Sequence, residues 1–435
     1  MRILIKDAFA VVESSKRIVR NVSVTIENGK IISVGERKAD FNPEVTIEGK
    51  GKKLVVMPGI MNAHIHTDET LNISFIPDNL GHVPWFKEWT LPYYHVLERE
   101  DFYWSALLSC MLMLESGTTC YADSANVQPH LSKEAAEKSG IRGFVAKWTS
   151  DIGEEFSSPT DQCIKESEQL LKLNKRGGRV KTIASVIGVN RTSNELYKAI
   201  KDLAHRYNTI VTSHEASGIE DVKLCIKRNG KRPIENLFSI GFLSDRTLLS
   251  HLTSITKREV SLISRTNTAF VTCPVAEMKK GKGFTKYGKL KELISSGTRI
   301  CVGTDTANSS NHLNVIRAAT LASLIAKDVS RDPKIADVYT VLKWVTEQPY
   351  SIFGLDGGRI ENGHAADISV FELEVGFNST DVIQELFYGN NQKCIATIVD
   401  GELVYNDGKF KNLDKESILK ECAKRAERIH KELLQ

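Results

Sequence analysis

Apolar and polar positions alternate with period two near both ends of the chain. Residues 22–34 alternate, turn at Asn-Gly and alternate again, and residues 395–405 do the same around Asp-Gly. Both patterns predict β-hairpins. The last segment, 415–434, has helical spacing and many charges, which predicts an amphipathic surface helix. Because both ends are β-rich, we expect residues 1–56 and 356–435 to form one small β-sandwich domain with a C-terminal helix.

The middle of the chain, residues 57–355, instead alternates apolar strand patterns with helical ones. Parallel strands that are buried on both faces give such near-continuous apolar runs. Eight strands that alternate with helices predict a (β/α)8 TIM-like barrel. The expected strands are 54–66, 118–123, 142–148, 180–188, 209–214, 247–251, 269–273 and 299–305.

Polar side chains of metal-binding type stand at the ends of these strands. His64 and His66 close the first strand, where residues i and i+2 point to the same face. His214, His251 and Asp305 each end a later strand. Any one of these three alone is more typical of a strand-end polar residue satisfied by a neighbouring loop. Because active-site residues of such barrels lie at the carboxyl ends of the strands, the five together predict a shared metal site.

The chemistry of these side chains suggests their roles. His64, His66 and His214 are the natural nitrogen ligands, and Asp305 is both a ligand and a proton acceptor. His251 is placed to donate a hydrogen bond to the substrate atom that gains charge. We expect one divalent ion, zinc first and iron or manganese as alternatives, because all accept this ligand set. Such an ion lowers the pKa of bound water from roughly 16 toward about 7, which permits hydrolysis at neutral pH.

Composition narrows the class of protein. Lys and Arg total 58 and Asp and Glu total 54, a net charge of +4, which gives no support for a nucleic-acid or membrane partner. The start of the chain does not read as a signal peptide, and no apolar stretch is long enough for a membrane span. We therefore expect a cytoplasmic protein. The eight cysteines form no CxxC pair and are expected to be buried, reduced thiols.

Several motifs, in this order, resemble the amidohydrolase superfamily. The nearest branch holds methylthioadenosine/adenosylhomocysteine deaminases, guanine deaminases and triazine hydrolases. The matching segments are Met57-Pro58-Gly59 with 62–66, 115–123, Cys273-Pro274, Gly303-Thr304-Asp305 and 363–367. The resemblance implies a barrel with a composite β-sandwich, one metal ion, a small heterocyclic substrate, and a homodimer or larger homo-oligomer.

The chain departs from that family at the position of a proton shuttle. The deaminases usually carry a glutamate three residues after the fifth-strand histidine, and here that residue is Ser217. Glu215 should point away from the site if the strand continues, and Glu220 reaches it only if the loop rearranges. Glu277, after the seventh strand, is a candidate catalytic residue that could replace this glutamate. A solvent-exposed ion pair of Glu277 with Lys279 or Lys280 is an equal alternative.

Substrate contacts are expected from loops at the barrel mouth. The long segment 67–100 follows the first strand and contains Trp85 and Trp89. A segment of this length commonly lies over an active site, although packing beneath the loop would also explain the tryptophans. Asn190 and Arg191 follow the fourth strand. An arginine there suits a carboxylate or phosphate of the substrate, or else a salt bridge within the protein.

Three functions are compatible with these residues. The first is a metal-dependent hydrolase that attacks a C–N bond of a nitrogen heterocycle, an aminohydrolase (deaminase) of a nucleobase-, nucleoside- or triazine-like substrate. The second is a chlorohydrolase or cyclic amidohydrolase on the same scaffold, which Ser217 favours because halide release needs no added proton. The third, a non-catalytic metal-binding homologue, is weakened because His251 accompanies a complete ligand set.

Overall fold

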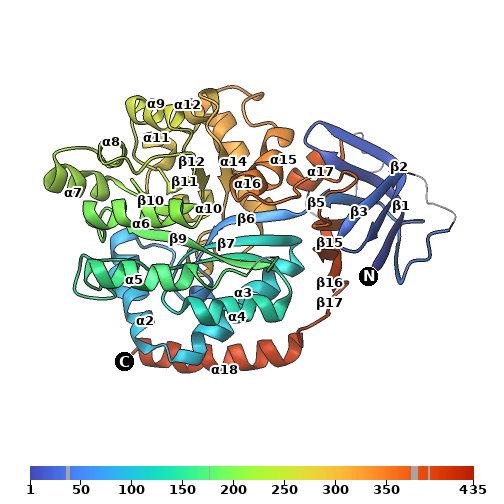
Figure 1. The fold of residues 1–435 in the computed structure, drawn as a ribbon, viewed down its shortest axis with the longest axis horizontal. Coiled ribbons are helices and arrows are strands. Elements are labelled where there is room, and N and C mark those ends of the chain that lie inside the picture. The colour runs from blue at the N-terminus through green and yellow to red at the C-terminus, as the bar shows by residue number, and fades with distance from the viewer. Residues whose placement is uncertain (36–39, 176, 374–380, 390–391) are drawn as a thin grey trace.

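An eight-stranded sheet forms the centre of the molecule (Figure 1). The structure is a computed structural model, and it describes residues 1–35, 40–175, 177–373, 381–389 and 392–435. All neighbouring strands of this sheet that pair are parallel. The strands are β6 (Ile60–Ile65), β7 (Thr118–Asn126), β8 (Arg142–Lys147), β9 (Val180–Gly188), β10 (Val211–Glu215), β11 (Thr247–His251), β12 (Ala269–Thr272) and β13 (Ile300–Val302).

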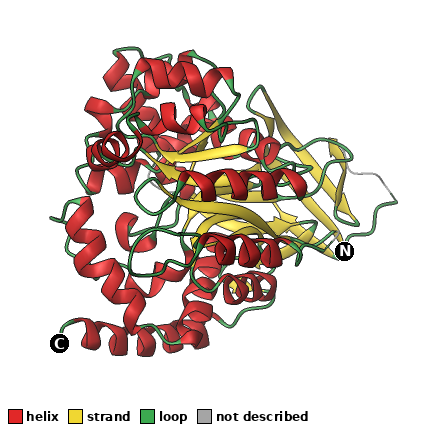
Figure 2. Cartoon of the chain, turned by 60° about the vertical axis from the view of Figure 1, so that its left-hand side comes forward, coloured by secondary structure: helices red, strands yellow, loops and turns green. Residues whose placement is uncertain are grey.

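The first and last strands of this sheet meet, so the sheet closes. Just beyond β13, the backbone N–H groups of Thr304 and Asp305 donate to the carbonyl oxygen of His64 in β6, at 3.1 and 3.0 Å. The predicted (β/α)8 barrel is therefore confirmed. Helices surround it (Figure 2): α3 (Arg99–Glu115), α4 (Pro129–Ser139), α5 (Thr160–Leu171), α6 (Asn194–Arg206), α7 (Ile219–Asn229), α8 (Pro233–Ser239), α9 (Lys257–Arg265), α10 (Pro274–Lys279), α11 (Phe284–Tyr287), α12 (Leu290–Ser295), α13 (Ala307–Ser310), α14 (Val315–Ser330), α15 (Val338–Val345) and α16 (Glu347–Ile352).

The long segment after β6 is more regular than the sequence suggested. It folds into a 3-10 helix, a short α-helix, a π-helical turn and another α-helix before α3 begins. These are η1 (Thr67–Asn72), α1 (His82–Pro84), η2 (Trp85–Thr90) and α2 (Leu91–Val96). Tyr93, in α2, is fully buried and its hydroxyl donates to the carbonyl oxygen of Asp68 in η1 at 2.9 Å. The segment is thus packed against itself rather than loosely attached.

The apolar run 54–66, expected to be one strand, is two strands in different sheets. β5 (Leu54–Pro58) pairs with strands from both chain ends, and β6 starts the barrel. The chain changes sheets at Gly59, whose N–H donates to Asp367 O at 2.7 Å. A Cβ at Gly59 would lie 2.3 Å from Thr119 Oγ1 and 2.6 Å from the Tyr350 hydroxyl. Apolarity alone could not reveal this break, because both halves are buried.

A second, nine-stranded sheet combines both ends of the chain, as predicted. Its order is β17-β16-β15-β14-β5-β1-β2-β3, with β4 beside β1, and Figure 1 shows it at the right of the barrel. The remaining strands are β1 (Arg2–Ser14), β2 (Arg17–Glu27), β3 (Lys30–Gly35), β4 (Val45–Glu48), β14 (Ile368–Leu373), β15 (Gln392–Val399), β16 (Glu402–Asn406) and β17 (Lys409–Phe410). Helix α17 (Val382–Tyr388) lies between β14 and β15 in the chain.

Both predicted hairpin turns are present in this sheet. Asn28 and Gly29 join β2 to β3, and Asp400 and Gly401 join β15 to β16. All four residues have φ between 51° and 81°, the backbone that two-residue hairpins with right-handed twist require. The two turns also pack together, since a Cβ at Gly401 would lie 2.5 Å from Gly29 Cα. The two turns thus lie in contact, within a sheet whose chain ends are joined by β5, which pairs with both β1 and β14.

Asp367, directly before β14, links this sheet to the barrel. It is 1% exposed, and its carboxylate accepts hydrogen bonds from Arg142 Nε at 2.8 Å and Tyr350 Oη at 2.9 Å. The backbone N–H of Asp400 donates to it as well, at 2.7 Å. A buried carboxylate with these partners holds β8, α16 and β14 in fixed positions.

Replacing Asp367 with alanine is expected to lower the free energy of unfolding by about 3–5 kcal/mol, because the largely buried Arg142 loses its fully buried partner and keeps only the half-exposed Asp400, at 3.5 Å. Chemical denaturation of the variant measures this loss. The control is Asp407→Ala, which removes an exposed pair with Lys393 at 2.6 Å and should cost less than about 1 kcal/mol. Equal losses in the two variants would contradict the role assigned to Asp367.

The C-terminal helix α18 (Lys415–Leu433) crosses the outside of α2 and α3, along the lower edge in Figure 1. Arg425 and Arg428 on this helix bind the carboxylate of Asp101, which is fully buried. The helix predicted at 415–434 is therefore present, and it is fixed to the barrel by charge as well as by apolar packing. Among the described residues, no helix is both long enough and apolar enough to cross a bilayer.

Candidate active site

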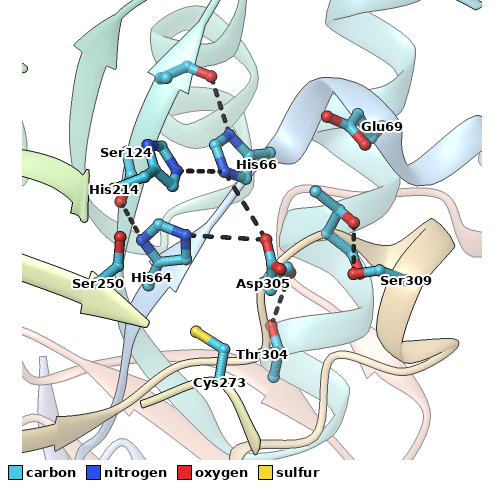
Figure 3. A network of polar contacts seen from close by, with 12 residues as sticks. His64, His66, Glu69, Ser124, His214, Ser250, Cys273, Thr304, Asp305 and Ser309 are labelled. Atoms are coloured by element: carbon cyan, nitrogen blue, oxygen red, sulfur yellow. Dashed lines mark hydrogen bonds and ion pairs between the residues drawn. The ribbon is translucent and has the colours of Figure 1, made fainter. Parts of the chain in front are cut away.

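Three imidazoles meet at the carboxyl end of the barrel (Figure 3). His64 and His66 leave the end of β6, and His214 leaves β10 on the opposite side of the sheet order. His66 Nε2 lies 3.1 Å from His214 Nε2. One ring nitrogen from each of the three histidines lies within 4.8 Å of the others. The structure thus brings together the three predicted nitrogen ligands.

Hydrogen bonds at Nδ1 fix the orientation of these three histidine rings. The Nδ1 atoms of His66 and His214 face the carbonyl oxygens of Ala125 and Ile187, at 3.1 and 2.8 Å. A carbonyl only accepts, so each Nδ1 carries a proton, and in the neutral imidazole each Nε2 then keeps its lone pair. Burial lowers the pKa of His66, but the nearby carboxylates, Glu69 first, outweigh it and leave that pKa raised. His64 Nδ1 contacts Ser124 Oγ at 2.7 Å, and its Nε2 is buried with no described hydrogen-bond partner.

Such an arrangement fits a metal ion. Two lone pairs that face each other at 3.1 Å repel unless a cation lies between them. Burial lowers the pKa of His64 well below its ordinary value and that of His214 to about 3, so both are neutral at neutral pH. Neutral imidazoles with the outer nitrogen hydrogen-bonded are the form that binds zinc. His64, His66 and His214 can therefore hold a divalent ion.

Asp305 completes the cluster from the loop after β13. Its Oδ1 lies 3.7 Å from His64 Nε2 and 3.8 Å from His66 Nε2. The residue has φ of 59°, and its N–H is held by the His64 carbonyl, so the backbone fixes the side chain toward the histidines. Burial alone would raise the pKa of Asp305, but the charge of Lys280 and then of the histidines holds it well below its ordinary value. The carboxylate is thus ionised.

His251 lies beside this cluster, at the end of β11. Its ring centroid is 5.4 Å from that of His64, and it shares the left-handed backbone of Asp305, with φ of 76°. Such backbone in a non-glycine residue is costly and is common at functional sites. Behind it, Glu277 Oε1 lies 3.4 Å from His251 Nδ1. The carboxyl group of Glu277 also accepts from the backbone N–H of Cys273 at 3.0 Å.

Glu277 is fully buried, so the alternative of a solvent-exposed ion pair with Lys279 or Lys280 is wrong. Burial raises the pKa of Glu277 to about 8. The side chain does not line the pocket in front of the histidines. It contacts His251 from behind, which suits a residue that orients the imidazole rather than one that touches substrate.

A pocket opens in front of the histidines and Asp305. Trp85, Asn190 and Arg191, three of the four predicted substrate contacts, line it. Trp89 does not line it and packs edge-on against Phe75, with ring centroids 5.7 Å apart. The other lining residues are His66, Glu69, His82, Phe86, Trp148, Ile187, His214, Ser217, Asp221, His251, Lys280, Lys282, Asp305 and Thr306.

Several of these lining residues were not identified from the sequence. Glu69, in η1, is buried and accepts from Tyr94 Oη at 2.9 Å and Asn308 Nδ2 at 2.7 Å. Lys280 and Lys282 are buried as well. His82 lines the pocket as well and stacks on Trp85, at 5.9 Å between ring centroids. Their position after barrel strands was the one sequence signal for these residues. It was not decisive, because the segments that contain them have the composition of ordinary surface loops.

The carboxylates near Ser217 lie where the strand direction placed them. Glu215 points away from the pocket and is held by Tyr197 Oη at 2.5 Å and Ser213 Oγ at 2.7 Å. Glu220 is exposed and does not line this pocket. Ser217 does line it, and Lys282 Nζ donates to its hydroxyl at 2.7 Å. A lysine therefore lies where the resemblance implies a glutamate.

Known proteins resemble this chain over almost its full length. A 5-methylthioadenosine/S-adenosylhomocysteine deaminase of Thermococcus sibiricus is 29% identical over 93% of this chain and 94% of its own. The fold matches an adenosine deaminase from Xanthomonas campestris with bound zinc, at a TM-score of 0.91 and 22% identity over 99% and 98% of the two chains. It also matches an atrazine chlorohydrolase from Arthrobacter aurescens complexed with zinc, at 0.89 and 21% identity over 98% and 100%. Because the profile of the amidohydrolase family matches residues 55–404, most of its length, the chain belongs to that family.

Proposed function

We propose that this protein is a zinc-dependent aminohydrolase that removes an amino group from a small nitrogen heterocycle. The carrying observation is the convergence of one ring nitrogen each from His64, His66 and His214 with the Asp305 carboxylate, beside a pocket that His66, His214 and Asp305 line. His64, His66 and His214 would hold the ion, with Asp305 as a further ligand. The names of the relatives as deaminases support the same reaction class.

Different residues around the pocket would accept the proton of water, stabilise the developing charge and position the substrate. When bound, the ion supplies Lewis acidity that makes water a nucleophile near neutral pH. Asp305, ionised and directed toward the histidines, accepts a proton from the attacking water. His251 donates a hydrogen bond to the ring atom that becomes negative, and Glu277 holds the imidazole in place from behind. Trp85 and Trp148 line the pocket and offer apolar ring surface to a heterocycle.

A second candidate, hydrolysis of a ring C–Cl bond, is favoured by Ser217. Loss of an amine needs a proton on the leaving nitrogen, whereas chloride leaves without one. A serine cannot supply that proton from its own acidity.

For amine loss, the pocket offers another proton carrier. Glu69 lines the pocket, and burial raises the pKa of its carboxyl group, which allows it to carry the proton to the leaving nitrogen.

Product analysis separates the two reactions. Zinc-loaded protein is offered purines, pyrimidines, pterins and triazines in matched amino and chloro forms, and ammonia and chloride are measured. We expect ammonia release, with turnover lost in Asp305→Ala. Chloride release alone would favour the second candidate. Absence of both products, in protein shown to hold one metal ion per chain, would refute the proposal.

A further inference from the structure

Lys282 is a buried cation that the protein leaves only partly paired. Its side chain lines the pocket, with the residue 9% exposed. Among the described residues, the one hydrogen-bond acceptor of its ammonium is the neutral Ser217 hydroxyl, at 2.7 Å. An ammonium has three donors, and burying a charge with no described carboxylate within 4.0 Å is costly. Burial, and next the charge of Lys280, lower the pKa of Lys282 to about 8, while the more distant carboxylates of Asp305, Glu277 and Asp221 act in the opposite direction.

Lys280, two residues earlier, shows the contrast. Its ammonium lies 3.4 Å from the centre of the Trp85 ring and 3.6 Å from Asp305 Oδ2. Both a carboxylate and an aromatic face therefore compensate its charge. Among the described residues, the same loop thus places at the pocket one lysine with a carboxylate within 4.0 Å and one lysine without. Packing alone does not require the second charge, because an apolar side chain of the same length would fill the space.

Arg191 is a second cation of this pocket without a carboxylate within 4.0 Å among the described residues. Its Nη1 donates to the backbone carbonyl of Glu155 at 2.6 Å, and the guanidinium lies over the rings of Phe86 and Trp148, at 5.5 and 5.9 Å. A backbone acceptor and two ring faces hold it in place while its charge stays available. The alternative of a structural salt bridge for this residue is therefore not what the described structure shows.

We propose that the substrate is a heterocycle that carries a carboxylate, which Lys282 and Ser217 bind with help from Arg191. This inference rests on the proposed function and names its substrate class. Asp221 also lines the pocket, where its carboxylate accepts from the Ser217 N–H at 2.9 Å. Its negative charge beside Lys282 favours a singly charged carboxylate over a doubly charged phosphate.

Binding of matched ligands tests this directly. Amino-substituted pyrimidine, pteridine and triazine rings are prepared with a carboxylic acid substituent and, for comparison, with the neutral carboxamide of the same shape. Calorimetric titration of zinc-loaded protein gives both dissociation constants. At least one acid should bind about tenfold or more tightly than its amide. Lys282→Met should weaken binding of that acid by at least about 30-fold, as for a buried charge pair that loses one partner. Binding of the amide should weaken by less than about threefold.

The matched control is Lys279→Met, which removes the same charge from the same loop. Lys279 donates to Asn311 Oδ1 at 3.1 Å and does not line the pocket. Its replacement should therefore change the dissociation constants of the acid and the amide by less than about twofold. Absence of any acid that binds more tightly than its amide would overturn the inference. Equal weakening of acid and amide by Lys282→Met would also overturn it, because the lysine would then contact the shared ring.

Thermal unfolding separates a binding role from a structural one. Without ligand, Lys282→Met should unfold at the same temperature as the wild type or higher, since an unpaired buried charge is removed. A fall of more than about 5 °C would mean that the lysine supports the fold and would overturn the inference. These results do not depend on turnover. Preferential acid binding without any ammonia or chloride release would leave the inference standing and refute the proposed function.

Discussion

Replacing His64 with asparagine is expected to remove the metal ion and to lower kcat/KM by at least about 1000-fold. His64 Nε2 is buried and has no described hydrogen-bond partner, while its Nδ1 is fixed by Ser124. The shorter amide of asparagine cannot reach the point where His66 and His214 converge. Loss of one of three nitrogen ligands should therefore leave the site unable to hold zinc at micromolar free metal.

Metal content by mass spectrometry and turnover on the identified substrate are measured together. The control is His130→Asn, since His130 is exposed on α4, and it should keep both near wild-type values. Because His64 is fully buried, circular dichroism of the metal-free variant must match that of metal-free wild type for the comparison to hold. A variant that folds, loses its metal and keeps full turnover would refute the assignment of the metal site.

Much of the scaffold is readable from residue patterns because local rules fix it. The Asn28-Gly29 and Asp400-Gly401 pairs specify hairpin turns through positive φ, whatever surrounds them. His64, His66 and His214 end barrel strands, and parallel strands place all their carboxyl ends on one rim. The ligand cluster follows from those two facts. It does not depend on loop structure, which explains why the sequence could indicate it.

Other features depend on contacts between distant segments. The break at Gly59 comes from the crowding of Thr119 and Tyr350, which lie 60 and 291 positions away in the chain. Trp85 and Trp89 are equivalent in the sequence, yet one lines the pocket and the other packs against Phe75. These outcomes depend on how a long segment folds back over the barrel. No periodic pattern carries that information.

The lysines of the pocket illustrate the same limit more sharply. The run from Lys279 to Lys282 has the composition of a solvated turn, but Lys280 and Lys282 are buried and only Lys279 faces outward. Whether a charge is buried depends on tertiary structure. Here the buried lysine Lys282 contacts Ser217, the residue that stands where the resemblance implies a glutamate. Recognising Ser217 as unusual was possible from the sequence. Recognising that Lys282 contacts it required the fold.

Replacing His251 with asparagine is expected to leave the metal bound and to lower kcat by about 100- to 1000-fold, the cost of losing one donor to a developing negative charge. Asparagine tolerates the left-handed backbone that His251 adopts at φ 76°. The variant therefore removes the imidazole without adding strain. In the proposed mechanism His251 acts on the reacting ring rather than on the ion, so this variant should keep its metal, whereas the His64 variant should lose it.

Glu277→Gln provides the graded comparison for this prediction. Glutamine keeps the shape of Glu277, whose Oε1 lies 3.4 Å from His251 Nδ1, but removes the carboxyl group. We expect a fall of about 10-fold in kcat with little change in KM, because the effect is transmitted through the imidazole. In a double variant with His251→Asn, the Glu277 substitution should have no further effect. Additive losses would show instead that Glu277 acts independently of His251.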